Sequence, residues 1–242
     1  MQSAVSAQQI SFKDEFVEAC QQAGALQLAD NVSSVFVAAD IVGKLRSLMT
    51  QEIVETYFMP LMGSRVGFLT DRDKEVNGKK PVPYGWETVR DCIIDAACIG
   101  LAPIKNQFNI IAGSMYPTKE GYTALLKKIG VKCYVSTSGD RSNPASQNAD
   151  IECKVSYKEP ADPDRMKNFT YLAAPKKNQY SSLDQLKGKA ERKAKKALYE
   201  LITGIDLGDA DETSGAVDDQ QQNVQSRKDA LRASKGEAPT LL

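Results

Sequence analysis

The segment from Ser181 to Thr203 constrains the fold most, because it combines helical apolar spacing with charges of nearly one sign. Its apolar residues recur three and four positions apart, which predicts a long helix with one buried face. The apolar stripe consists of Leu183, Leu186, Ala190, Ala194, Ala197, Leu198 and Leu201. The basic residues that flank it are Lys187, Lys189, Arg192, Lys193, Lys195 and Lys196, with Glu191 as their offsetting acid.

The basic side chains of this segment are expected to reach outward and form a ridge that suits phosphate groups. Each phosphate that a cation neutralises releases counterions, which adds affinity without any reading of base sequence. The alternative is a solvated helix face. We favour polyanion binding, because like charges at this density repel one another without a partner.

The net charge of zero hides an uneven distribution along the 242 residues. Residues 103–203 hold 18 basic and 10 acidic side chains, whereas residues 1–102 hold 9 and 13 and residues 204–242 hold 4 and 8. The neutrality is therefore a cancellation between a basic middle part (net +8) and two acidic flanks (net −4 each). It does not argue against a nucleic-acid partner.

Composition excludes several chemistries. The chain has no histidine, which removes Ser-His-Asp and Cys-His catalysis and histidine-bound zinc. Its five cysteines include no CxxC pair, so we expect reduced thiols packed as small apolar residues. A phosphate loop at Gly113–Lys119 is rejected, because the second glycine is missing and Glu120 follows the lysine. With no membrane-length apolar run and no secretion signal, we expect a soluble cytoplasmic protein without a cofactor.

The apolar patterns predict an α+β fold in which N-terminal helices precede a small antiparallel sheet packed with helices. Helices are expected over about 11–24, 34–62, 86–99, 118–129 and 181–203, strands over 108–112, 131–137, 151–157 and 169–173, and a polar loop over 71–83. Residues 1–204 form the expected core, with a helical part (1–70) and an α+β part (84–204). Residues 205–242 are expected to be a flexible acidic tail.

A second candidate surface interleaves lysines with aromatic residues between Gly100 and Lys128. Bases can stack on aromatic rings while lysines hold the backbone of a single strand. We expect Phe108 to be core, and the choice between core and surface stays open for Tyr116 and Tyr122. The lysines of this surface are Lys105, Lys119, Lys127 and Lys128.

Two pairs of carboxylates support a different hypothesis, a Mg²⁺-dependent enzyme acting on nucleic acid. Asp71 and Asp73 lie in the polar loop, and Asp209 and Asp211 lie in the tail. Solvated loop acids are the favoured interpretation, because no supporting constellation accompanies either pair.

The order of motifs resembles the RecT/Red-beta single-strand annealing proteins of phages. The resemblance covers about residues 86–203, and the matching order is more specific than any one motif. Its segments are a helix ending in Gly100-Leu-Ala-Pro103, then Tyr116-x-Thr-Lys119-x-Gly121-Tyr122, and then Ala190-Glu-Arg192-Lys193-Ala-Lys195-Lys196-Ala-Leu198. The segment after Gly100 is shorter than in many members, so the Erf-type and eukaryotic annealing families stay open as relatives.

This resemblance implies a protein that binds single-stranded DNA and anneals it to a complementary strand without ATP, as a ring or helical filament. It implies subunit contacts through the N-terminal helices, and contacts of the tail with a single-strand-binding protein or exonuclease, in a bacterial host. Modulation of DNA binding by a divalent cation is left open. The DNA contacts carried over by position are Lys105, Lys119, Tyr122, Lys189, Arg192, Lys193 and Lys196, and Lys127 joins them from the interleaved surface. An adaptor whose basic helix binds an acidic protein is the other alternative.

Overall fold

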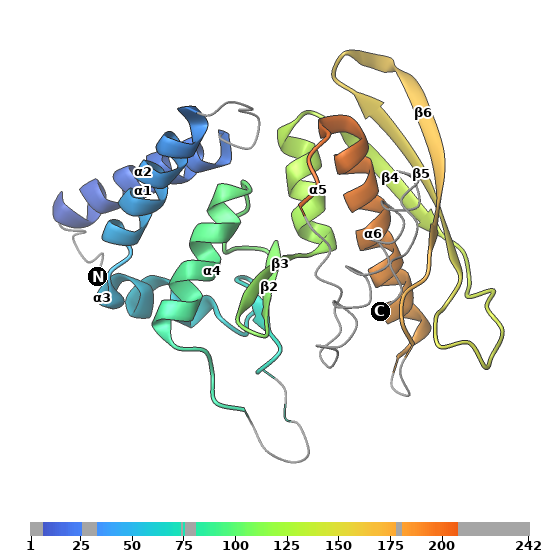
Figure 1. Ribbon diagram of the computed structural model, residues 1–242, viewed down its shortest axis with the longest axis horizontal. Helices are drawn as coiled ribbons and strands as arrows, with labels where there is room; N and C mark the ends of the chain where they lie inside the picture. Colours follow the sequence, from blue (N-terminus) through green and yellow to red (C-terminus); the bar gives the residue numbers. More distant parts are fainter. Residues whose placement is uncertain (1–6, 26–32, 74, 76–80, 178–180, 208–242) are drawn as a thin grey trace, which may run out of the picture. The chain divides into compact units, whose positions relative to one another are not determined.

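The protein is described here from a computed structural model, which places residues 7–25, 33–73, 75, 81–177 and 181–207. The first part of the chain is helical, as expected. Helices α1 (Ala7–Ala25) and α2 (Ser33–Leu48) pack against each other, and both contact α4 (Trp86–Cys98), as Figure 1 shows. None of the described helices is both long enough and apolar enough to cross a membrane.

The prediction of a single helix over 34–62 is wrong, because α2 ends at Leu48 and a new helix begins at Gln51. Thr50 adopts an extended conformation, and its hydroxyl accepts a hydrogen bond from the Ile53 amide at 3.4 Å. A threonine in this role starts a new helix rather than continuing the old one. Three short turns follow: α3 (Gln51–Ile53), the π-helical η2 (Val54–Phe58) and the 3-10 helical η3 (Met59–Leu61).

A small three-stranded sheet lies beside α4. Strand β2 (Phe108–Ile111) pairs antiparallel with β3 (Ser114–Pro117) and parallel with the two-residue β1 (Leu69–Thr70). Only β2 was predicted from the sequence. β1 is too short to show alternation, and β3 has four residues, of which the last is a proline. The β2–β3 hairpin turns at Ala112 and Gly113, both of which have positive φ.

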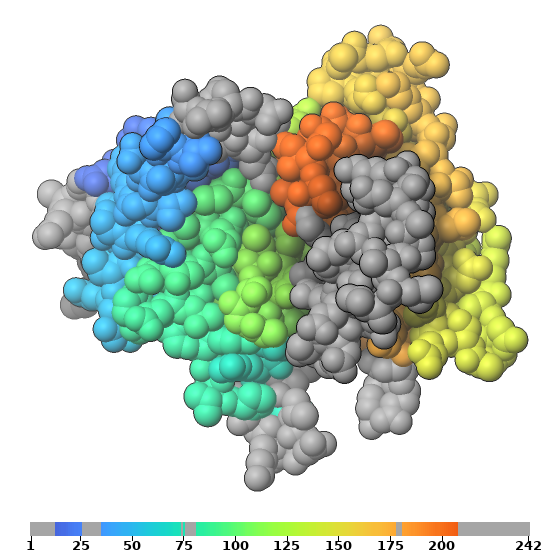
Figure 2. Space-filling view, viewed as in Figure 1, coloured from blue at the N-terminus to red at the C-terminus, as the bar shows by residue number. Residues whose placement is uncertain are grey.

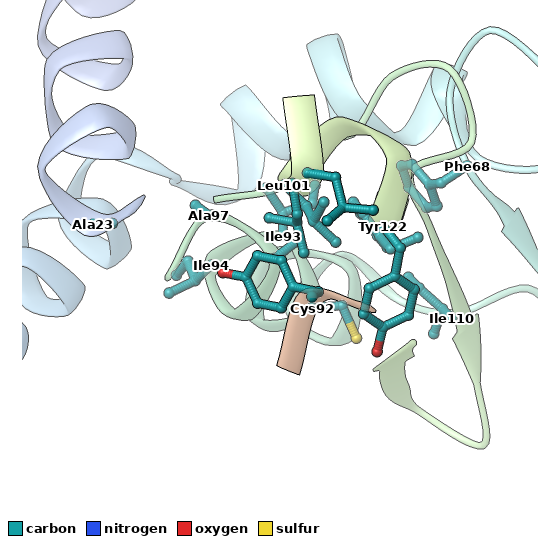
Figure 3. Close-up of a cluster of buried hydrophobic side chains, with 14 of the residues drawn as sticks. Ala23, Phe68, Cys92, Ile93, Ile94, Ala97, Leu101, Ile110 and Tyr122 are labelled. Atoms are coloured by element: carbon teal, nitrogen blue, oxygen red, sulfur yellow. The ribbon is translucent and has the colours of Figure 1, made fainter. Parts of the chain in front are cut away.

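Helix α5 (Lys119–Lys128) begins where it was expected. The Thr118 hydroxyl caps it by accepting a hydrogen bond from the Gly121 amide at 3.1 Å. Gly121 packs so closely against the Gln107 carbonyl that a Cβ at this position would overlap that oxygen. Next to it, Tyr122 points into a buried apolar cluster that includes Ile93 and Ile110 (Figure 3).

The second sheet has the order β4–β5–β6 and is antiparallel throughout. Its strands are β4 (Lys132–Thr137), β5 (Ile151–Glu159) and β6 (Asp162–Ala173). β6 starts seven residues before the expected strand, because Asp162–Asn168 carry little apolar signal but extend the hairpin with β5. The buried residues of β5 alternate with its outward ones.

Helix α6 (Leu183–Thr203) packs against the second sheet and lies beside α5, as Figure 1 shows. Ser182 and Gln185 form a capping box at its start, and Gly204 ends it in the left-handed conformation (φ 72°). Ile205 and Leu207 then pack against the core, so the compact unit ends at Leu207. The predicted tail otherwise lies outside the described residues.

These observations confirm the α+β class. The sheet arrangement differs from the expectation, since the strands of the described residues form two small sheets of three strands each rather than one. Each sheet has its own covering helix: α4 contacts β2 and β3, and α6 contacts β4, β5 and β6.

Candidate nucleic-acid interface

Four of the predicted DNA contacts share one stripe of α6. Because α6 is continuous from Leu183 to Thr203, residues at i, i+3, i+4 and i+7 lie on the same side of it. We call these four residues the α6 stripe: Lys189, Arg192, Lys193 and Lys196. In Figure 2 the C-terminal part of α6 (orange) reaches the surface next to β6 (yellow-orange).

The side chains of the α6 stripe are less exposed than the sequence predicted. Arg192 is 7% exposed and Lys196 is 8% exposed, whereas Lys189 and Lys193 are half-buried. The expectation that all of them reach outward is therefore wrong for Arg192 and Lys196. The helical spacing was predicted correctly, but burial depends on what packs over the helix, which the spacing does not contain.

Lys196 is paired with two carboxylates. Its Nζ lies 3.2 Å from Oε1 of Glu200, one helical turn further on, and 3.5 Å from Oδ1 of Asp206, beyond the helix end. Burial raises the pKa of Glu200, although its hydrogen bond to Lys196 acts in the opposite direction. Lys196 therefore binds negatively charged oxygens already. An external anion at Lys196 has to compete with these two carboxylates.

Glu191 links α6 to α5 rather than offsetting the basic ridge on the surface. Its Oε1 accepts a 2.6 Å hydrogen bond from Lys195, and its Oε2 lies 3.5 Å from Nζ of Lys119 on α5. Lys195 also donates to the Thr123 hydroxyl at 2.9 Å. Burial raises the pKa of Glu191, but the hydrogen bond and charge of Lys195 and the charge of Lys119 outweigh it and lower the pKa overall.

These contacts also give the register of the two helices. Lys119 meets Glu191, and Thr123, one turn later on α5, meets Lys195, one turn later on α6. The helices therefore run parallel. Lys119, which the sequence predicted as a DNA contact, lies in this contact between helices and is only partly exposed.

The remaining predicted lysines lie at opposite ends of α5. Lys105 is exposed in the loop before β2, next to Asn106, whose carbonyl accepts a 2.5 Å hydrogen bond from the cap residue Thr118. Lys127 is exposed in the last turn of α5. Eight residues of helix separate Lys119 from Lys127 by about 12 Å. The structure thus groups Lys105 with Lys119, and places Lys127 apart from them.

Tyr122 is a core residue. Its side chain is 1% exposed and lies among Leu101, Ile93 and Ile110 (Figure 3). The expectation that its ring contacts DNA bases is therefore not compatible with this conformation. Phe108 is fully buried as expected, and Tyr116 is half-buried on β3, opposite Asn109.

The carboxylates of Asp71 and Asp73 accept hydrogen bonds from nearby backbone amides and hydroxyl groups. Asp71 accepts hydrogen bonds from the Tyr84 hydroxyl at 2.9 Å and from the Ala112 amide at 3.0 Å. Asp73 accepts from the amide and hydroxyl of Thr70. Asp209 and Asp211 lie outside the described residues. Within the part of the chain that the structure describes, no group of three or more Asp, Glu or Cys side chains could hold a metal ion.

All five cysteines are free thiols, as expected. Cys92 and Cys153 are buried, and burial is the main reason why the pKa of Cys92 rises to about 12 and that of Cys153 to about 11. These thiols are therefore protonated at neutral pH and act as small apolar residues.

One group of residues was missed by the sequence reasoning. The outward face of the second sheet carries Tyr134, which is 71% exposed, together with Lys132, Lys154 and Lys158. The sequence predicted a strand over 131–137 but assigned no face to its residues. The period-2 alternation of a strand is the signal that could have put Lys132 and Tyr134 on one side of it. Comparison with known proteins adds nothing to this site: no family model, curated protein or solved structure matches the chain.

Proposed function

We propose that this protein binds single-stranded DNA and anneals complementary strands without ATP. The α6 stripe is the observation that carries the proposal, since it sets four cations on one side of a helix anchored by the sheet and by α5. Lys189 and Lys193 are its more accessible members, whereas Arg192 and Lys196 are buried and add positive charge behind them. A fixed row of cations binds a phosphate backbone without reading its sequence.

Annealing needs two conditions that such a surface can supply. The repulsion between two strands must be screened, and the bases must remain available for pairing. Backbone contacts through lysine and arginine screen charge without covering the base edges. Oligomerisation, which belongs to the same proposal, multiplies weak backbone contacts along a strand. The proposal places this activity in a phage-type recombination system of a bacterial cytoplasm, with the tail as contact for a single-strand-binding protein or exonuclease.

A fluorescence assay with complementary oligonucleotides tests the proposal. One strand carries a donor dye and the other an acceptor, and pairing is followed at low salt without nucleotide. We expect the protein to accelerate pairing and to lose this effect as salt rises. Unchanged pairing at every protein concentration would contradict the proposal, and particle imaging with and without DNA would show whether rings or filaments form.

The contacts of Lys196 favour a second candidate, an adaptor that binds an acidic protein segment. Lys196 lies within 3.5 Å of carboxylate oxygens of Glu200 and Asp206. A competition assay separates the two candidates. If an acidic peptide displaces a labelled oligonucleotide at much lower concentration than unlabelled oligonucleotide does, the adaptor is the better description.

A further inference from the structure

The outer face of the second sheet is an open surface, on the side opposite to α6. In the antiparallel register, residues directly opposite each other point to the same side. Cys153, Val155 and Tyr157 of β5 are buried, so their neighbours in the strand point outward. Four rows of outward residues cross the sheet: Lys132 and Lys158; Tyr134, Ser156 and Asn168; Ser136, Lys154 and Thr170; and Glu152 and Leu172.

Tyr134 stands in the middle row with small and polar neighbours. Its side chain is 71% exposed, because Ser156 opposite it is too small to cover an aromatic ring. Ser156 donates a 2.6 Å hydrogen bond to Oδ1 of Asn168 on β6, so this row also presents fixed polar groups. At the far side, Leu172 of β6 adds an apolar side chain that is 69% exposed.

The rows on either side of Tyr134 carry three lysines. Lys132 and Lys158 are paired across β4 and β5, two residues from Tyr134 and Ser156, and Lys154 lies two residues from Ser156 on the other side. The exposed or partly exposed acids of these three strands are Glu152, which pairs with Lys154 at 3.7 Å and with Arg141 at 3.1 Å, Glu159, which pairs with Lys167, and Asp162 and Asp164, which lie at the start of β6, four residues or more before Asn168. Lysines therefore lie in the rows on both sides of Tyr134.

We propose that this face is a second binding surface for single-stranded DNA, on which a base stacks against Tyr134 while Lys132, Lys154 and Lys158 hold the backbone. The inference deepens the proposed function and rests on it. An unpaired base offers a π-face to an aromatic ring, whereas the bases of a duplex are already stacked on each other. The surface should therefore prefer single strands. Since α6 lies on the opposite side of the sheet, this surface is separate from the α6 stripe.

The test measures the anisotropy of a fluorescein-labelled oligothymidine as full-length protein is added, over a series of salt concentrations. We expect Tyr134→Ala to weaken binding about fivefold or more, with an unchanged salt slope, because it removes stacking but no charge. Tyr134→Phe, which keeps the ring, should bind like the wild type. Lys132→Ala with Lys158→Ala should reduce the salt slope by about 1.4, or about 0.7 for each phosphate contact with a single strand.

The control for charge is Lys13→Ala with Lys44→Ala, which removes two lysines from α1 and α2. This pair should leave the salt slope nearly unchanged. Circular dichroism checks that each variant is folded. The inference is overturned if folded Tyr134→Ala binds like the wild type, or if the pair at Lys13 and Lys44 has the same effect as the pair on the sheet.

The outcomes also separate the two proposals. If the wild type binds no single-stranded DNA at any salt concentration, the proposed function fails and the sheet surface fails with it. If the wild type binds and only variants of the α6 stripe weaken binding, the proposed function stands and the sheet inference is overturned. A direct readout is photocrosslinking of an iodouridine oligonucleotide, which we expect to map to the peptide that contains Tyr134.

Discussion

Lys195 donates a 2.6 Å hydrogen bond to Glu191, one turn earlier on α6, and so holds the carboxylate between α6 and α5. From the other side, Lys119 of α5 approaches the same carboxylate at 3.5 Å. This contact changes how the basic helix is understood. Lys195 of α6 and Lys119 of α5 hold the two helices together through Glu191. The α6 stripe lies on another side of α6.

Replacing Glu191 by glutamine should loosen the contact between the two helices. We expect Glu191→Gln to lower the free energy of unfolding at pH 7 by about 1 kcal/mol, because a partly buried charge-assisted contact is lost. The pKa of Glu191 in the folded protein lies below its ordinary value. Its contribution is therefore present above that ordinary value and is lost as pH falls through the lowered one. Urea unfolding at several pH values measures both effects, and a variant as pH-sensitive as the wild type would contradict this assignment.

Removing charge from the α6 stripe should weaken DNA binding and its salt dependence together. Lys189→Ala with Lys193→Ala is the preferred pair, because these side chains are only half-buried and their loss disturbs packing least. We expect the salt slope of oligonucleotide binding to fall by about 1.4. Lys193→Ala with Lys196→Ala should lower affinity as well, but it also breaks the contacts to Glu200 and Asp206. An unchanged salt slope in both double variants would show that DNA does not bind at the α6 stripe.

Gly121 and Gly188 offer a matched pair of glycine substitutions. In Gly121→Ala the new Cβ would overlap the Gln107 carbonyl, so α5 has to move away from the loop before β2. We expect a loss of stability of about 1–3 kcal/mol or more. In Gly188→Ala the new Cβ meets open space inside α6, and we expect a gain of about 0.5–1 kcal/mol. Thermal unfolding of the two variants gives the comparison, and equal melting temperatures would refute the close approach at Gly121.

Asp71 should matter for stability rather than for chemistry. Asp71→Ala removes the acceptor for the Tyr84 hydroxyl and the Ala112 amide, and we expect it to cost about 1–3 kcal/mol. Asp71→Asn retains one oxygen acceptor and should cost less. Incubation of a labelled oligonucleotide with Mg²⁺ tests the enzyme alternative in the same proteins. That alternative gains support if the wild type cleaves the strand and folded variants at Asp71 and Asp73 do not.

The position of a C-terminal truncation should decide its effect on stability. A chain ending at Thr203 loses Ile205 and Leu207, which pack against the core, and Asp206, which pairs with Lys196. We expect it to be less stable by about 1–3 kcal/mol than a chain ending at Leu207. The chain ending at Leu207 should retain annealing in vitro, as the polar composition of residues 208–242 predicts. Equal urea midpoints for both truncations would show that these three residues contribute nothing.

The sequence predicted elements well wherever their signals are local. Thr118 caps α5, and Gly130 and Gly204 follow α5 and α6 with positive φ, as the sequence predicted. The capping box of Ser182 and Gln185 at the start of α6 was not predicted. The sequence-based prediction failed at Thr50, where a threonine inside an apolar pattern starts a new helix. It also failed at β1, whose two residues form a strand only because β2 lies beside them.

For the candidate site, the sequence by itself determined which residues share a side of α6, because helical periodicity is a property of neighbouring residues. Only the tertiary structure decided what those sides meet. Lys119 and Glu191 are 72 residues apart in the chain yet lie in one contact, and Tyr122 is covered while Tyr134 is open. Burial and pairing arise from segments that are distant in sequence, so no local pattern could assign them.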